Sequence, residues 1–77
     1  MRTGIVISYN AVVRCGLIKD CNEQKIRFYN ENLNWVFKRF DVVNFSVVYL
    51  VAGLRAVNVT AIINSRGEPV SLAISIS

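Results

Sequence analysis

Two stretches of this 77-residue chain place cations beside aromatic rings. Lys25, Arg27 and Tyr29 alternate with Ile26 and Phe28, and the segment 31–40 holds three aromatic residues next to two adjacent cations. Rings of this kind stack on unpaired bases, and cations pair with phosphate groups. Both patterns have a second interpretation. The alternating strand face is then only solvated, and Trp35 and Phe40 plug one end of the core while Lys38 and Arg39 stay in water.

Catalytic and metal-binding chemistry has weaker candidates. The chain contains two cysteines, Cys15 and Cys21, and no histidine, so it cannot assemble a four-ligand zinc site or a disulfide framework within one protomer. Without a histidine to activate it, Cys15 is expected to be a buried or half-buried packing residue. The acidic residues fall mainly at predicted turns, and no carboxylate pair is evident. We therefore expect no enzyme activity and no cofactor.

Composition limits the architecture and the partners. The chain is short enough for one domain, 53% of its residues are hydrophobic, and its net charge is +4. The charge favours polyanionic partners, although the basic residues are spread along the chain. So many apolar residues cannot all be buried in a domain of this size, which favours self-association. The N-terminal residues show no signal-peptide pattern and the longest apolar run, Val47 to Ala52, is too short to span a bilayer, so we expect a cytoplasmic protein without membrane contact.

Short segments rich in Val, Ile, Phe and Tyr alternate with turn-forming residues, which predicts an all-β domain. Strands are expected at about 3–9, 13–19, 25–30, 42–51 and 55–63, with a sixth at 70–76. The period of two gives each strand an inward and an outward face. Lys25, Arg27 and Tyr29 are the outward set of the third strand. The expected inward residues are Ile26, Phe28, Val43, Phe45, Val47, Val57, Val59 and Ala61.

We divide the chain into a barrel at 1–63 and a C-terminal extension at 64–77, which contains a turn and the sixth strand. Gly67 is expected to adopt a positive φ in that turn, and Pro69 to fix the entry to the strand. The sixth strand has two alternatives. It either pairs with residues 55–63 of its own chain or is exchanged between protomers.

Four short motifs, TGIV at 3–6, NA at 10–11, GLI at 16–18 and AVNVT at 56–60, resemble those of bacterial cold-shock domains in order and separation. The resemblance covers residues 3–62. It implies a five-stranded antiparallel barrel of the OB type, which binds single-stranded nucleic acid through aromatic rings on its first three strands, flanked by Lys and Arg.

The chain departs from the family at most of those rings. Ser8 stands where the family usually has Trp, Cys15 and Leu17 replace two rings of the second strand, and Arg27 and Asn30 replace two rings of the third. Arg27 retains a planar guanidinium that stacks and pairs with phosphate. The residues that we expect to bind nucleic acid are Tyr9, Lys19, Arg27, Tyr29, Phe37, Lys38 and Arg55, with Phe37 exposed on its loop.

These observations predict a protein that binds single-stranded RNA or DNA weakly and with little sequence preference. The resemblance implies roles such as RNA chaperoning or gene regulation. The alternative is a divergent barrel that has lost this activity and acts as a protein-interaction or oligomerisation module, since Ile7, Cys15 and Leu17 leave an apolar sheet surface. A homodimer would then form through the C-terminal strand or that apolar face.

Overall fold

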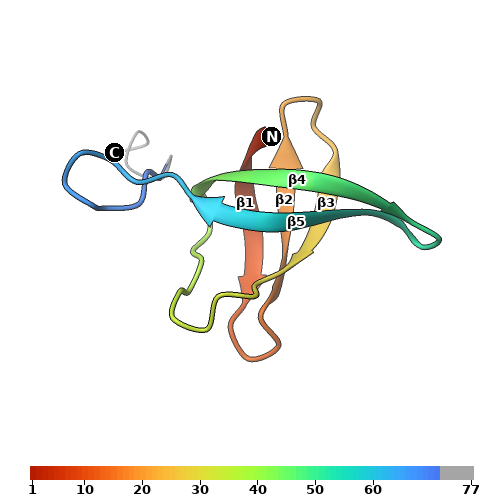
Figure 1. Cartoon of the computed structure of the whole chain (residues 1–77), viewed down its shortest axis with the longest axis horizontal. Helices are drawn as coiled ribbons and strands as arrows, with labels where there is room; N and C mark the ends of the chain where they lie inside the picture. Colours follow the sequence, from red (N-terminus) through yellow and green to blue (C-terminus); the bar gives the residue numbers. More distant parts are fainter. Residues whose placement is uncertain (72–77) are drawn as a thin grey trace.

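The computed structural model describes residues 1–71 and contains a closed five-stranded barrel (Figure 1). Its strands are β1 (Arg2–Asn10), β2 (Cys15–Asp20), β3 (Lys25–Tyr29), β4 (Val42–Leu50) and β5 (Gly53–Ala61). Their order around the barrel is β1-β2-β3-β5-β4, β4 closes onto β1, and only the β3–β5 pairing is parallel. The all-β prediction is confirmed, and this strand order is consistent with an OB-type barrel.

The core lies between these strands and is apolar. Ile26 and Phe28 are buried on β3 while Lys25, Arg27 and Tyr29 are exposed, as the period of two predicts. Gly16 on β2 has no side chain because a Cβ there would collide with the backbone carbonyl of Ser8 and the ring of Phe28. The core consists of Val6, Ile18, Ile26, Phe28, Phe37, Val43, Phe45 and Ala56.

Two β-bulges interrupt the regular alternation. On β1 the pairing shifts between Val6 and Ser8, so that Ile7 is the extra residue. On β5 the pairing with β4 shifts near Asn58, which adopts a φ of 53°, a conformation that Asn tolerates better than most residues. Because each extra residue reverses the alternation, inward and outward positions exchange beyond it.

The bulge on β5 makes one predicted core residue wrong. Val57 was expected to point inward, but Ala56 is buried and Val57 is only partly buried outside the core cluster. Val59 and Ala61, which follow the bulge, pack against the core as predicted. The bulge near Asn58 therefore lies between Val57 and Val59, two residues that a strict period of two had assigned to the inward face of this strand.

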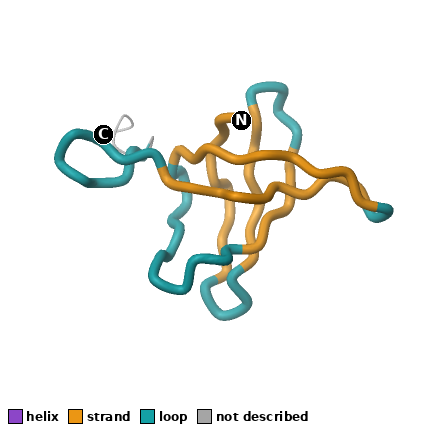
Figure 2. Tube along the Cα trace, viewed as in Figure 1, coloured by secondary structure: helices purple, strands orange, loops and turns teal. Residues whose placement is uncertain are grey.

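Loops connect the strands at both ends of the barrel (Figure 2). The second strand begins at Cys15 rather than at 13, because residues 11–14 form a turn in which the side chain of Asn10 accepts the Val12 N–H at 2.9 Å. After β5, Asn64 organises a return loop by accepting N–H groups of Arg66 and Glu68, and Gly67 has the predicted positive φ of 77°.

Residues 62–71 return toward the start of β4. The Val70 N–H donates to Ile62 O at 2.8 Å, and the Val42 N–H donates to Val70 O at 3.0 Å. Residues 72–77, which include most of the predicted sixth strand, lie outside the described part of the chain. The C-terminal strand and its two alternative pairings remain predictions.

Candidate nucleic-acid interface

The outward face of β2 and β3 carries a row of paired side chains. In the ladder Cys15 lies opposite Tyr29, Leu17 opposite Arg27 and Lys19 opposite Lys25. Directly opposed residues in a sheet project to the same face, so the predicted outward residues Lys19, Arg27 and Tyr29 share one surface. Three aromatic rings that the resemblance leads one to expect are absent from this surface, and three of its six side chains are cations.

Arg55 of β5 joins this face from a distant part of the sequence. It is the ladder partner of Arg27 in the parallel β3–β5 pairing, so two arginines lie side by side on neighbouring strands. Strands are about 4.8 Å apart, and like charges at this spacing destabilise a sheet unless something neutralises them. The barrel topology thus creates a local positive site that is not visible as a charge cluster in the sequence.

Two surface grooves meet at this pair of arginines. The first is lined by Lys25, Arg27 and Arg55 together with Gln24, Leu50, Ala52, Gly53 and Leu54. The second extends from the same two arginines across Phe28 and Tyr29 to Ser8, Asn10, Val13, Cys15, Gly16 and Leu17. Both grooves share Arg27 and Arg55, and we call the two together the arginine groove.

No carboxylate neutralises the arginine groove within residues 1–71. The ion pairs among residues 1–71 are Arg2–Asp20 at 3.5 Å and Lys19–Glu23 at 3.7 Å. Asp20 is further occupied in the β2–β3 turn, where its Oδ1 accepts the N–H groups of Asn22 and Gln24, both at 2.9 Å. The groove cations therefore remain available to an external anion.

Tyr29 is the aromatic ring that this face exposes, with 42% of its surface accessible. The guanidinium of Arg14 lies 5.3 Å from the ring centroid and donates a hydrogen bond to the Tyr29 hydroxyl. The predicted second strand, 13–19, included Arg14. It lies instead in the turn before β2 with a φ of 58°, which frees its side chain from the strand pattern.

Tyr9 and Phe37 are not on this surface. The bulge at Ile7 turns Tyr9 toward the core, where its ring stacks on Phe28 at a centroid distance of 5.9 Å and its hydroxyl accepts a hydrogen bond from Asn30 Nδ2. Phe37 is 3% exposed, so the prediction that it is the exposed ring of its loop is wrong. It packs edge-on against Phe28 and Tyr9 at 5.4 and 5.8 Å.

The loop between β3 and β4 therefore closes the barrel rather than presenting rings to a ligand. Phe37 is its buried plug and Trp35 is partly buried beside it, at a centroid distance of 6.5 Å. Asn30 holds the loop in place, since its Nδ2 also donates to Trp35 O at 2.6 Å and its Oδ1 accepts the Asn32 N–H at 3.0 Å. This outcome matches the alternative interpretation of segment 31–40, with Phe37 as the plug instead of Phe40.

The two remaining predicted cations lie apart from the arginine groove. Lys19 shares the outward face, but it pairs with Glu23 and lines a different depression beside Ile5 and Val42. Lys38 is exposed on the loop, where its N–H donates to Asp41 Oδ2, and it lines neither part of the groove. Of the seven predicted residues, the structure brings Arg27, Tyr29 and Arg55 together, and it adds Arg14 and Lys25.

Other chemistry finds little support in the described residues. Cys15 is exposed and lines the arginine groove, and Cys21 is exposed in the β2–β3 turn, so the expectation that Cys15 is a buried or half-buried packing residue is wrong. No group of three or more metal-ligating side chains occurs within residues 1–71. The same residues contain no helix long and apolar enough to cross a membrane.

The comparisons with known proteins add no relative: no protein-family model matches the chain, and neither the curated proteins nor the solved structures yield a match.

Proposed function

We propose that the arginine groove binds single-stranded RNA or DNA, weakly and with little sequence preference, as the resemblance to cold-shock domains implies. The observation that carries the proposal is the side-by-side placement of Arg27 and Arg55 without a neutralising carboxylate among residues 1–71. A phosphate bound between two guanidinium groups would replace their repulsion with charge-assisted hydrogen bonds.

The proposed mode of binding relies on the phosphate backbone. Four cations line or border the groove, namely Arg14, Lys25, Arg27 and Arg55. Tyr29 offers one ring, and stacking a base on it contributes about 1–3 kcal/mol. A channel with four cations and one ring distinguishes poorly among bases, because every phosphate has the same charge and every base has a π-face.

The shape of the groove also suits a single strand. It follows the surface from the β4–β5 hairpin, across β3, to the turn between β1 and β2, and the residues that line it include Gly16, which has no side chain, and the apolar Leu17. A duplex is wider and stiffer than a single strand and would follow this surface groove less closely. An extended strand can lay successive phosphates along it.

Salt dependence of oligonucleotide binding tests the proposal. Four phosphate contacts predict a slope of about −2.8 in log K against log salt, which is an approximately 50-fold loss of affinity between about 50 and 200 mM salt. The probe is a fluorescent oligonucleotide of about 8 nucleotides, titrated with the full chain and read by anisotropy. No saturable binding at about 50 mM salt would refute the proposal.

A matched pair of variants separates the groove from the overall charge. Arg55→Gln removes a groove cation and is expected to weaken binding about five- to tenfold and to make the salt slope shallower by about 0.7. Arg66→Gln removes the same charge from the exposed return loop and is expected to change affinity less than about twofold. Equal effects of the two changes would show that binding follows net charge and not the groove.

A second candidate function, protein interaction, has one observation in its favour. The end of the β4–β5 hairpin exposes Val48, Tyr49, Leu50 and Val51, and contiguous exposed apolar residues usually mark a partner surface. Leu50 also lines one end of the arginine groove, whereas Val48, Tyr49 and Val51 do not line it. The two candidate functions therefore do not exclude each other.

A further inference from the structure

The β4–β5 hairpin continues beyond the strands that cover the rest of the barrel (Figure 1). The β1–β4 ladder joins Arg2 to Phe45 and ends there, whereas β4 continues to Leu50. Within residues 1–71, no strand pairs with β4 at 46–50 on the side away from β5. These residues form an open sheet edge with unpaired backbone N–H and C=O groups.

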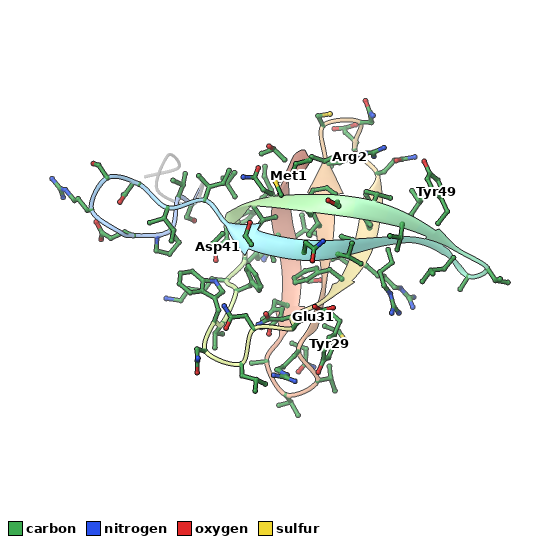
Figure 3. The ribbon with its side chains drawn as sticks, in the orientation of Figure 1. Met1, Arg2, Tyr29, Glu31, Asp41 and Tyr49 are labelled. Atoms are coloured by element: carbon green, nitrogen blue, oxygen red, sulfur yellow. The ribbon has the colours of Figure 1, made fainter. Side chains whose placement is uncertain are left out.

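This edge has none of the features that usually prevent strands from pairing. Residues 46–54 contain no charged side chain and no proline, and the β4–β5 pairing is regular from Ser46 to Leu50. Tyr49 is 78% exposed and projects away from the barrel (Figure 3). A long, apolar, uncharged edge is the kind that pairs with another strand.

We propose that this edge pairs with the same edge of a second copy of the chain, in an antiparallel ladder centred near Val48. An antiparallel pair related by a two-fold axis places the same patch of each copy against the other, and this segment suits that arrangement because no like charges would face each other. Ser46 would lie opposite Leu50 of the second copy, and Val47 opposite Tyr49.

The charge of the protein does not oppose this contact. The nearest groove cation along the ladder is Arg55, which is the partner of Val48 on β5. In the paired arrangement the two Arg55 residues would be separated by three strand spacings, about 14 Å, which exceeds the Debye length of about 8 Å at physiological salt. Repulsion between the two copies is therefore largely screened at the interface.

Other occupants fit the edge less well. A lipid surface would cover the apolar side chains but would leave the backbone groups of the open edge without hydrogen-bond partners. The return segment of the same chain lies at the other end of β4, where Val70 bonds to Val42. Because an edge contact through residues 46–50 buries less area than a standard interface, we expect a reversible dimer with a dissociation constant on the order of 10 μM.

Sedimentation equilibrium of the full chain over a wide concentration range tests the proposal. Val48→Lys would place two charges against each other at the two-fold axis and is expected to weaken the dimer at least about tenfold. Val12→Lys makes the same change at an exposed residue of the β1–β2 turn, which is 91% accessible, and is expected to leave dimerisation unchanged. A monomer at about 1 mM, or equal masses for the two variants, would overturn the proposal.

Cross-linking tests the register independently of stability. In a chain whose native cysteines are replaced by serine, Val48→Cys is expected to form an intermolecular disulfide on mild oxidation, because opposed strand residues have Cα separations of about 4.5–5.5 Å. Val12→Cys in the same background is the control and is expected to remain monomeric. Equal cross-linking at both positions would mean random collision and would overturn the proposed edge contact. Neither experiment contains nucleic acid, so their failure would leave the proposed function of the groove untouched.

Discussion

Arg27 and Arg55 provide a test in which folding stability and ligand binding change in opposite directions. The two residues are ladder partners on β3 and β5, and no carboxylate within residues 1–71 forms an ion pair with either. At a separation of about 5 Å in water, two unit charges repel by about 0.8 kcal/mol. If the guanidinium groups lie as close as the strands that carry them, we expect the free protein to carry a local destabilisation that a bound phosphate would relieve.

Replacing either arginine with glutamine is expected to raise the free energy of unfolding by about 0.5 kcal/mol at low salt, once screening is included. The double variant should gain no more than either single variant, because the repulsion is removed only once. At about 1 M salt the Debye length is about 3 Å and the gain should nearly vanish. All three variants should bind the oligonucleotide less tightly than the unaltered chain.

Urea unfolding followed by the fluorescence of Trp35, the single tryptophan, measures these differences. Trp35 packs beside the core, so its environment changes when the barrel opens. Arg66→Gln again serves as the control, since it removes a charge without removing a close like-charge neighbour. If the single variants are destabilised, or if their effects add in the double variant, the two guanidinium groups do not repel each other and the argument for an anion site between them fails.

Three further predictions concern the core and the groove. Gly16→Ala should destabilise the fold by about 1–3 kcal/mol in urea unfolding, because its Cβ would meet Phe28 and a backbone oxygen. Asn30→Ala should cost about 3 kcal/mol by the same assay, since it removes three hydrogen bonds at a buried position, whereas Asn34→Ala should cost little. Bound oligonucleotide should slow alkylation of Cys15 in the groove but not of Cys21, as peptide mass spectrometry would show; equal protection would contradict the assigned site.

The period of two predicted the strands well wherever the ladders are regular. On β3 it assigned Ile26 and Phe28 to the core and Arg27 and Tyr29 to the surface, and the structure agrees. It fails at Val57, because β5 gains an extra residue beside it. The bulge at Ile7 likewise turns Tyr9, which the resemblance had placed on the binding surface, toward the core. A bulge depends on how two strands fit together, and neither strand carries that information alone.

Loop and turn residues were harder to predict for a related reason. Phe37 and Arg14 lie outside the strands, where no periodicity assigns a side chain to a face. Phe37 is buried because the loop folds over the open end of the barrel. Asn30 fixes that loop through hydrogen bonds to Trp35 within it and to Tyr9, which is distant in sequence. For Arg14 a usable signal existed, since Asn10 favours a turn that would have ended the strand pattern before it.

The proposed dimer and the proposed groove together predict a dependence on oligonucleotide length. Val48 and Arg55 are directly opposed in the β4–β5 ladder, so their side chains project to the same face, and an antiparallel edge contact would bring both arginine grooves to one side of a continuous sheet. A strand long enough to occupy both grooves gains from effective concentration, whereas a short strand does not.

At protein concentrations that favour the dimer, we compare the affinity of the unaltered chain with that of Val48→Lys. The ratio should be about tenfold larger for an oligonucleotide of about 16 nucleotides than for one of about 8, because the charge added beside Arg55 acts at both lengths. Anisotropy titration of both lengths measures the difference, with Val12→Lys as the control for added positive charge. If the ratio of the two affinities, unaltered chain to Val48→Lys, is the same at both lengths, the two grooves do not act together, even if the protein dimerises and binds nucleic acid. If only the unaltered chain binds the longer oligonucleotide more tightly, the uncharged hairpin edge and the charged groove are linked. A dimer is the arrangement that supplies a second set of cations to the same oligonucleotide.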